Sequence, residues 1–345
     1  MRAETHNPPF FLGIDLGGTN IKSGVVDDAG QPLSAVSVET LAAQGPEAGV
    51  RRLAEAGRRA VDASGLNWHD IAAVGLGSPG TMDLAAGSLL DPYNLPGWDR
   101  FPIRARLAEL VDKPTVLQND ANAAAFGEFW AGAGRGTQSL VLFTLGTGVG
   151  CGIVHEGTLI EGRHSHGAEC GHMTVQMENG RQCSCGSFGH LEAYASATAL
   201  VQRAMEAMAH EESALLRQSL RDKALTSRSI AEAAERGDRL AQRLMRETAR
   251  YLAVGAVNLM HTIDPDIVLF GGGMIAAGDP FLDAIRADIR RLAFPLLRDR
   301  TRVAFAELGG DAGFIGAAGC ARMALGVSGC KDRQESTFDT PRELR

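Results

Sequence analysis

The sequence predicts an internally duplicated α/β protein in which two domains flank a cleft. The chain has 345 residues, which is more than one hydrophobic core usually supports. Three short apolar runs joined by tight turns, typical of an antiparallel β-meander, occur within residues 10–38 and again within 139–160. Because helices and a further strand follow the meander in each half, we expect one fold to be used twice.

The first half begins with short apolar runs bounded by turn-forming residues. We expect strands at 10–14, 21–26, 33–38, 71–76 and 116–118. Residues 46–63 combine helical apolar spacing with scattered charge and predict an amphipathic helix. A Gly-Ser-Pro-Gly turn at 77–80 ends the fourth strand. The last strand leads into Asn119 and Asp120, which open an alanine-rich helix to about Trp130.

The second half repeats this order and adds a long helical segment. Strands are expected at 139–145, 149–154, 158–160 and 267–270. Helices are expected within 195–263 and at 312–325, whereas 331–345 is rich in charge and turn formers and is expected to be disordered. The predicted domains are a small one (8–119 with 312–328), a large one (120–311) and a tail (329–345).

A short glycine-threonine turn follows the first strand of each half. The two turns are Asp15-Leu16-Gly17-Gly18-Thr19 and Leu145-Gly146-Thr147-Gly148. Glycine lets backbone N–H groups approach phosphate oxygens, threonine adds a hydroxyl, and aspartate can hold a hydrated magnesium ion. Neither turn matches a P-loop or a dinucleotide fingerprint, and each alone could be ordinary chain reversal. The two together indicate a phosphotransferase in which both turns grip one polyphosphate.

The composition excludes several classes of protein. Apolar residues make up 45% and charged residues 22%, and no apolar run is long enough to cross a bilayer, so membrane insertion is excluded. The formal net charge of -7 argues against a nucleic-acid partner. Residues 1–9 lack the apolar core of a secretory signal, and six cysteines do not make a disulfide scaffold, so we expect a cytoplasmic protein with reduced thiols.

Four residues with metal-binding side chains lie close together in the second half. Cys183 and Cys185 flank one serine, His190 follows, and His172 precedes them. Two thiolates and two imidazoles suffice for tetrahedral zinc, and a site with no open position is structural. The alternative is a pair of buried thiols and two surface histidines that never meet.

The order of these motifs resembles that of the ROK family of sugar kinases and repressors. The resemblance runs from Phe10 to about Val327 and includes both glycine turns, the Glu169-Cys170-Gly171-His172 segment and residues 183–192. It implies the actin-like ATPase fold, with two RNase H-like α/β domains flanking a cleft that binds nucleotide on one side and sugar on the other. Family members usually carry a third cysteine where this chain has His190, so we expect a Cys2His2 zinc site.

The resemblance also implies a role for individual residues. Asp120 resembles the aspartate that removes the proton from the sugar 6-hydroxyl; capping of the following helix is an alternative role that could coexist with it. Asp15 would orient magnesium through water, and Lys22 would face phosphate, although a lysine whose charge merely reaches solvent is as good an account. The expected nucleotide- and phosphate-binding set is Asp15, Gly17, Gly18, Thr19, Lys22, Gly146, Thr147, Gly148, Gly271, Gly272 and Gly273.

Sugar recognition should use side chains that bridge neighbouring hydroxyls. The expected sugar-binding set is Gly80, Asn94, Asn119, Asp120, Glu169, His172 and Glu192. His172 would bind zinc through one ring nitrogen and sugar through the other. Trp98, just after Asn94, belongs either to a segment that closes over the sugar or to the core.

The resemblance predicts an ATP-dependent hexokinase of glucokinase type that uses Mg²⁺ and structural Zn²⁺. Fructose, mannose, N-acetylmannosamine and N-acetylglucosamine remain alternative substrates. A sugar-responsive repressor is the alternative from another class, which the few residues before the first strand disfavour. An actin-like assembly protein is a third, disfavoured by Asp120 and the zinc segment. We also expect a homo-oligomer, a dimer or a tetramer, because relatives commonly form them.

Overall fold

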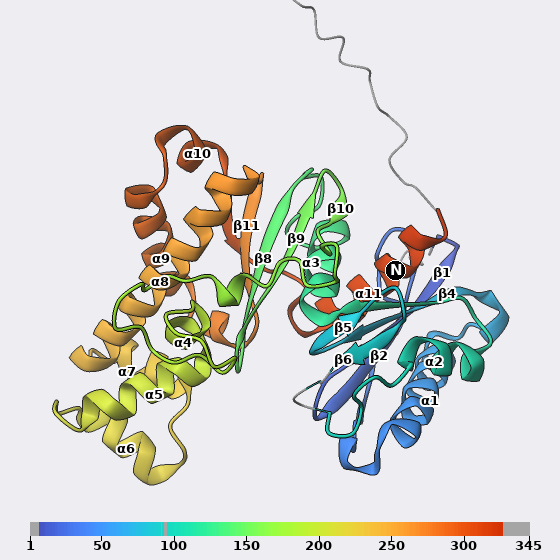
Figure 1. Ribbon diagram of the computed structural model, residues 1–345, viewed down its shortest axis with the longest axis horizontal. Coiled ribbons are helices and arrows are strands. Elements are labelled where there is room, and N and C mark those ends of the chain that lie inside the picture. The colour runs from blue at the N-terminus through green and yellow to red at the C-terminus, as the bar shows by residue number, and fades with distance from the viewer. Residues whose placement is uncertain (1–6, 91, 93–94, 327–345) are drawn as a thin grey trace, which may run out of the picture.

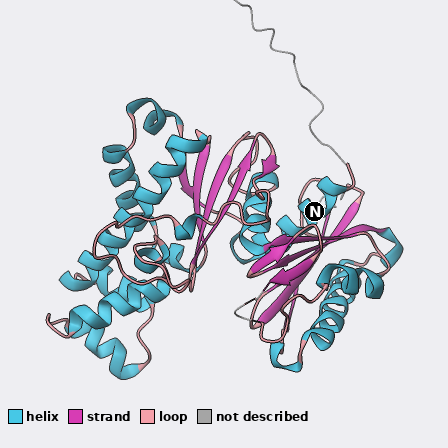
Figure 2. Cartoon of the chain, in the orientation of Figure 1, coloured by secondary structure: helices cyan, strands magenta, loops and turns pink. Residues whose placement is uncertain are grey.

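The computed structural model describes residues 7–90, 92 and 95–326, and within them the chain forms two α/β halves. Each half is built on a mixed five-stranded sheet, and the two sheets lie on opposite sides of a central helix pair (Figure 1). Helices cover the outer faces of both sheets, and more of them surround the second sheet (Figure 2).

The first sheet has the strand order β3-β2-β1-β4-β7. Its strands are β1 (Phe10–Leu16), β2 (Asn20–Val26), β3 (Val36–Glu39), β4 (Ile71–Ser78) and β7 (Thr115–Asn119). The first three run antiparallel as a meander, whereas β4 and β7 run parallel to β1. Helices α1 (Pro46–Ser64) and α2 (Ile103–Val111) pack on one face, and β5 (Thr81–Asp83) and β6 (Ser88–Leu90) form a separate hairpin.

The second sheet repeats that order as β10-β9-β8-β11-β12. Its strands are β8 (Leu140–Leu145), β9 (Val149–His155), β10 (Thr158–Leu159), β11 (Ile267–Gly271) and β12 (Arg302–Phe305). Again three strands form an antiparallel meander and two run parallel to the first of them. The identical order confirms the predicted duplication.

Helices of the second half pack around the outer face of this sheet. They are α4 (Glu192–Ala195), α5 (Ala197–Met208), α6 (Ala214–Asp222), α7 (Ser227–Glu235), α8 (Arg239–Ile263), α9 (Asp279–Leu292) and α10 (Pro295–Arg300). The predicted helical stretch 195–263 is thus divided into separate helices. Ser196, Ser213, Thr226 and Asp238 each cap the helix that follows by accepting a backbone hydrogen bond, which explains the divisions.

Two helices between the sheets join the halves. Helix α3 (Asp120–Trp130) packs on the second sheet and α11 (Ala312–Ala324) on the first, and the two cross each other (Figure 1). The backbones meet directly, because a Cβ on Gly316 would lie 1.6 Å from the carbonyl oxygen of Ala123. Glu128 of α3 is fully buried and accepts hydrogen bonds from the N–H groups of Glu307 and Leu308, just before α11.

The third predicted strand begins later than expected. It was predicted at 33–38, but β3 starts at Val36. Ser34 explains the delay: its hydroxyl, rather than its backbone, accepts the hydrogen bond from the Val25 N–H group. The sequence analysis also missed the short strands β5, β6 and β12 and the helices α2, α9 and α10.

Candidate active site

Two adjoining cavities of about 510 Å³ each lie between the halves. The knuckle cavity, named for the Cys183–Cys185 segment beside it, is lined by Gly80 and Asn119 from the first half and by Glu169, His172 and Glu192 from the second. The glycine cavity is named for its glycine-rich wall. Its lining includes Asp15, Gly17, Gly271, Gly272, Gly273, Gly309, Gly310 and Gly313.

Asp120 lies where the cavities meet. Together with Ala121, Thr144 and Gly272, it lines both of them. Asp120 directly follows β7. Strands β4 and β1 run parallel to β7 and end at the same edge of the sheet, where β1 contributes Asp15. Carboxyl ends of parallel strands are where open α/β sheets bind ligands.

Asn119, not Asp120, caps helix α3. Its side-chain oxygen accepts hydrogen bonds from the N–H groups of Ala121 and Asn122 at 3.0 and 3.2 Å. Asp120 is the first helical residue, so the prediction that it caps the helix is wrong. Asn119 has extended backbone dihedrals, as a capping residue needs, and Asp120 already has helical ones. One oxygen of Asp120 accepts from the Ala121 N–H group at 2.8 Å.

The environment of Asp120 favours its protonated form. Burial, followed by the negative charge of Asp15, raises the pKa of Asp120 to about 7. Burial also raises the pKa of Asp15 to about 6, although the charge of Lys22 opposes that rise. A carboxyl group with a pKa near neutrality is suited to accept a proton in general base catalysis.

The first glycine turn meets the cavities only through Asp15, Leu16 and Gly17. Gly18 and Thr19 are exposed and line neither cavity. Lys22 donates to the Gly310 carbonyl oxygen at 2.9 Å and pairs with Asp311 at 2.7 Å, so its ammonium group connects β2 to the segment before α11.

The second glycine turn lines the knuckle cavity and not the glycine cavity. The turn is closed by a hydrogen bond of 3.0 Å from the Gly146 N–H group to the Gly148 carbonyl oxygen. A Cβ on Gly148 would lie 2.3 Å from a carboxylate oxygen of Glu192, so only glycine allows Glu192 this approach. In this structure the two turns therefore flank the junction at Asp120 from different cavities.

The predicted third glycine segment packs against the second turn. Gly272 has a φ of 85°, and a Cβ there would lie 2.5 Å from the Leu145 carbonyl oxygen. Glycine is thus required both by backbone conformation and by space. Gly271, Gly272 and Gly273 all line the glycine cavity.

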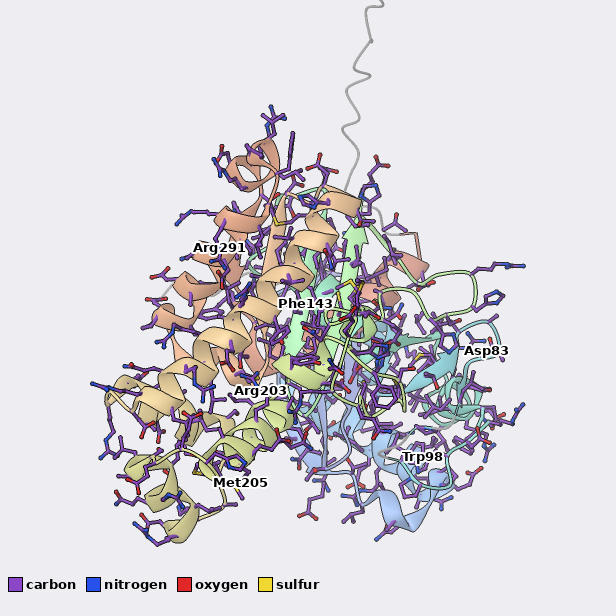
Figure 3. The ribbon with its side chains drawn as sticks, turned by 60° about the vertical axis from the view of Figure 1, so that its left-hand side comes forward. Asp83, Trp98, Phe143, Arg203, Met205 and Arg291 are labelled. Carbon is purple, nitrogen blue, oxygen red and sulfur yellow. The ribbon has the colours of Figure 1, made fainter. Side chains whose placement is uncertain are left out.

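Most predicted sugar-binding residues come together around the knuckle cavity. Gly80, Asn119, Asp120, Glu169, His172 and Glu192 all line it. Asn94 lies outside the described residues. Trp98 is fully buried in the core of the first half, and Figure 3 shows it well apart from Phe143 of the second-half core. The interpretation of Trp98 as a core residue is therefore the correct one.

The predicted zinc ligands His172, Cys183, Cys185 and His190 converge. Their donor atoms all lie within 4.8 Å of one another. The Nδ1 atom of His172 is 3.6 Å from the sulfur of Cys183, and that of His190 is 3.3 Å from the sulfur of Cys185. Zn–S bonds of about 2.3 Å and Zn–N bonds of about 2.0 Å give donor separations of this order in a tetrahedron. The donor set therefore fits zinc, and the four side chains leave no coordination position open.

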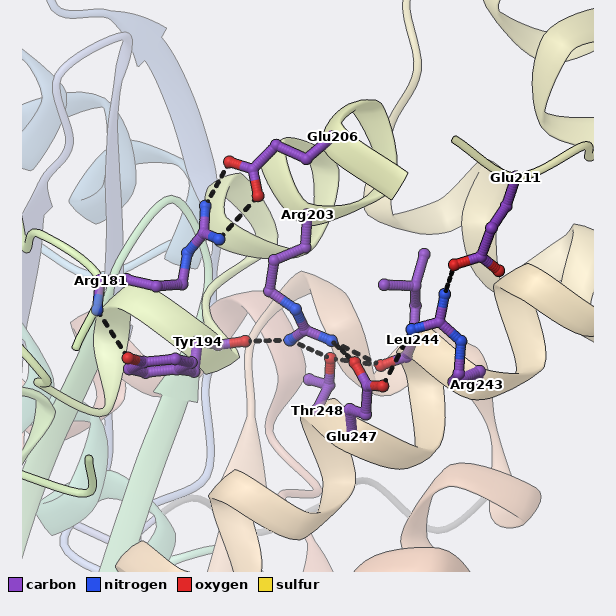
Figure 4. A network of polar contacts seen from close by, with 9 residues as sticks. All are labelled: Arg181, Tyr194, Arg203, Glu206, Glu211, Arg243, Leu244, Glu247 and Thr248. Carbon is purple, nitrogen blue, oxygen red and sulfur yellow. Dashed lines mark hydrogen bonds and ion pairs between the residues drawn. The ribbon is translucent and has the colours of Figure 1, made fainter. Parts of the chain in front are cut away.

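A network of ion pairs and hydrogen bonds joins the segment before Cys183 to the helices α4, α5 and α8. Arg181, two residues before Cys183, forms two hydrogen bonds with Glu206 of α5, and its N–H group donates to the Tyr194 hydroxyl (Figure 4). Arg203 is buried and donates to the Tyr194 carbonyl oxygen and to Glu247 of α8 (Figure 4). The residues of this network line a groove of about 900 Å³. Their hydrogen bonds hold α4 against α5 and α8.

Comparison with known proteins shows which family this chain resembles over most of its length. A profile of the ROK family matches residues 11–324. The chain belongs to the ROK family. It is 36% identical over 317 residues to a glucokinase of Thermotoga maritima, which covers 92% of this chain and 98% of that protein. It is 35% identical over 308 residues to a glucokinase of Halalkalibacterium halodurans, with 89% and 93% covered.

A solved ROK structure gives the same picture in three dimensions. The chain matches the crystal structure of a ROK family glucokinase from Streptomyces griseus in complex with glucose and AMPPNP. The TM-score is 0.76 and the identity is 38%, with 91% of this chain and 99% of that chain covered. The predicted actin-like ATPase fold of the ROK family is confirmed.

Several cavity residues of this ROK protein were missed by the sequence analysis. Thr144 lines both cavities, Ser184 lines the knuckle cavity, and Glu128 and the Gly309-Gly310 pair line the glycine cavity. The glycine pair was the available signal, because it follows an apolar strand as the other glycine segments do. Ser184 lies between the two predicted cysteine ligands and Thr144 directly before the second glycine turn, but the interpretation of both motifs depended on their neighbours and gave these two side chains no role. Within the described residues, no helix is long and apolar enough to span a bilayer.

Proposed function

We propose that this ROK protein is a glucokinase, which transfers the γ-phosphoryl group of ATP to the 6-hydroxyl of glucose. The observation on which the proposal depends is the position of Asp120 at the junction of the two cavities. In-line transfer requires the acceptor hydroxyl and the terminal phosphoryl group to meet at one point. The relatives that are glucokinases cover almost the whole chain, which supports the same activity.

In the proposed reaction, Asp120 accepts the proton of the attacking hydroxyl as the new O–P bond forms and the bond from the γ-phosphorus to the bridging oxygen of ADP breaks. A pKa of about 7 leaves a useful fraction of the carboxylate ionised at neutral pH while keeping it basic. Sugar would occupy the knuckle cavity, where Glu169, His172 and Glu192 can bridge neighbouring hydroxyls. Nucleotide would occupy the glycine cavity, with the backbone of Gly271–Gly273 beside it.

Two metal ions complete the proposal. Mg²⁺ bound to the nucleotide would neutralise phosphate charge, and Asp15 would hold it through water. Zn²⁺ held by His172, Cys183, Cys185 and His190 would fix the knuckle. His172 lines the cavity with the same ring that faces Cys183, so the metal would orient a sugar-binding side chain.

The remaining predictions belong to the same proposal. We infer a small domain of residues 8–119 with 312–328 and a large domain of residues 120–311, because each range contains one five-stranded sheet and α11 packs on the first of these sheets. A homo-oligomer and a cytoplasmic location, where ATP is available, stay predictions. Gly18, Thr19 and Lys22 stay candidates for phosphate contact, which would require movement toward the glycine cavity.

A coupled assay of ADP formation tests the activity. Purified protein is supplied with Mg²⁺ and ATP and with glucose, mannose, fructose, N-acetylmannosamine or N-acetylglucosamine in turn. In a parallel series polyphosphate replaces ATP, and the sugar phosphate itself is measured. We expect the highest kcat/KM with glucose and ATP, and a product phosphorylated at the 6-hydroxyl. Comparable or higher kcat/KM with an N-acylhexosamine would assign the other substrate class. No sugar-dependent ADP formation with any hexose would contradict the kinase activity itself.

A further inference from the structure

The carboxylate of Glu192 lies between two segments that the proposed reaction uses separately. One oxygen, Oε2, accepts the Val149 N–H group at 3.0 Å, at the end of the second glycine turn. The other, Oε1, accepts the hydroxyl of Ser184 at 2.7 Å, between the two cysteines of the knuckle. The sulfur of Cys183 is a more distant neighbour, at 3.8 Å from Oε1. Glu192 therefore connects the knuckle to the turn.

These contacts leave room for a ligand. A carboxylate offers about four lone-pair directions; Val149 uses one on Oε2, and the Ser184 hydroxyl and the Cys183 thiol donate to Oε1, so at least one direction stays available. Glu192 is half-buried and lines the knuckle cavity, so an available direction can accept a sugar hydroxyl. A bound sugar would thus contact the Glu192 carboxylate, whose position is set by its hydrogen bonds with Ser184 and Val149.

The turn in contact with Glu192 also contacts the nucleotide side. Leu145, at the start of the turn, packs backbone to backbone against Gly272, which lines both cavities. On the opposite side of the turn, the Gly146 carbonyl oxygen accepts the Ala197 N–H group at 2.9 Å. The path from Ser184 through Glu192 to Val149 and Gly272 is therefore continuous and consists of direct contacts.

We propose that Ser184 is a positioning residue that, through Glu192, couples sugar binding to nucleotide binding across the second glycine turn. The proposal rests on the glucokinase function inferred above. Loss of the Ser184 hydroxyl removes the shorter hydrogen bond to Oε1 of Glu192 and leaves only the distant Cys183 sulfur there, which weakens the hold of Glu192 on Val149. Binding of either substrate then does less to order the site for the other.

Ser184→Ala tests this, with Ser184→Thr as the conservative variant and Ser187→Ala as the matched control. Ser187 is an exposed serine in the same knuckle whose hydroxyl is three residues from the one in question. Titration calorimetry measures the dissociation constant of glucose with and without AMPPNP and Mg²⁺, and hydrogen exchange measures protection of the Val149 amide. Bound zinc is measured for every variant.

In the wild-type protein we expect AMPPNP to tighten glucose binding by about fivefold or more. Ser184→Ala should bring this factor close to one, because Glu192 loses its charge-assisted hydrogen bond from the knuckle, and should accelerate Val149 exchange. Ser184→Thr and Ser187→Ala should retain both values. All variants should retain zinc.

Four outcomes would overturn the proposal. These are unchanged Val149 exchange in Ser184→Ala, an unchanged coupling factor, a wild-type factor of one, and zinc loss confined to Ser184→Ala, which would make the serine a support of the metal instead. Failure of wild-type protein to bind glucose would count against the glucokinase function, and the Val149 exchange comparison would still decide whether Ser184 positions Glu192.

Discussion

The two halves share one sheet topology but place different chemistry at equivalent positions. The first meander turns after Asp15-Leu16 and the second after Thr144-Leu145, with the strands in the same order on each side. Asp15 of the first half therefore corresponds to Thr144 of the second. Both side chains line the glycine cavity, one as a carboxylate and one as a hydroxyl.

This difference shows how a duplicated scaffold becomes an asymmetric site. Asp15 and Asp120, the carboxylates whose pKa values are raised most clearly, lie at the carboxyl ends of strands of the first sheet, Asp15 within β1 and Asp120 directly after β7. The second half contributes the uncharged turn, the knuckle and the side chains held by it. The duplicated fold has two equivalent sheet edges, and both aspartates with raised pKa values lie at the edge of the first sheet.

Removing the acid at the end of β7 should have the largest effect. Asp120→Asn should lower kcat by about two to four orders of magnitude, because the proton of the attacking hydroxyl loses its acceptor. Calorimetric glucose affinity should change little. Turnover within tenfold of the wild type would contradict the role of Asp120.

Thermal unfolding of the same variant distinguishes loss of chemistry from loss of fold. Because the pKa of Asp120 is raised to about 7 in the native protein, ionisation of this group disfavours folding as pH rises from about 4 to 7. Asn has no charge to bury, so Asp120→Asn should unfold at a higher temperature than wild type at pH 8 and at a similar temperature near pH 4. The opposite order at pH 8 would exclude a raised pKa.

Removing zinc tests the contribution of the second half, whose sheet edge carries neither Asp15 nor Asp120. Cys183→Ser should release zinc and weaken glucose binding by about tenfold to a hundredfold, because the knuckle orients His172 and Glu192. Metal content and calorimetry measure the two effects. Cys320→Ala, in α11 and outside the knuckle, should retain both properties. Full glucose affinity in metal-free protein would show that the network behind the knuckle is sufficient.

Two glycines of the second turn differ in the space around them. A Cβ on Gly148 would displace Glu192, whereas no atom lies within 4 Å of a Cβ on Gly146, and neither residue has a positive φ. Gly148→Ala should therefore lower kcat/KM for glucose by about a hundredfold, the cost of a misplaced contact, and Gly146→Ala by much less. Equal kinetics for the two variants would mean that Glu192 does not need its observed position.

The smallest expected effect is a shift in the pH dependence of kcat/KM, caused by the charge of Asp15 acting on Asp120 at the same edge of the first sheet. kcat/KM for glucose should fall as pH drops below about 7, because only ionised Asp120 accepts a proton. Asp15→Asn removes a negative charge that raises this pKa, so the falling limb of its residual activity should move to lower pH. Asp83→Asn, on the separate hairpin, should leave the limb in place.

The fold was more predictable from sequence than the contacts of the site. Alternating apolar runs and the repeated meander specify the sheets, because burial of one strand face imposes the pattern. The zinc ligands were predicted from residue type and spacing, and Asp120 from the resemblance to the ROK family. The location of the second turn, the capping role of Asn119 and the bridging role of Ser184 were not, since each depends on backbone approach between segments far apart in the chain.

The direct backbone contact between α3 and α11 constrains how this enzyme can open. With Gly316 against the Ala123 carbonyl oxygen, no compressible layer of side chains separates the helices. The halves are therefore expected to pivot about this crossing and not to slide apart. Asp120 begins α3 less than one helical turn from that pivot, so it should travel little while the outer walls of both cavities swing widely. We therefore expect Asp120 to keep its position relative to both cavities as the halves open and close.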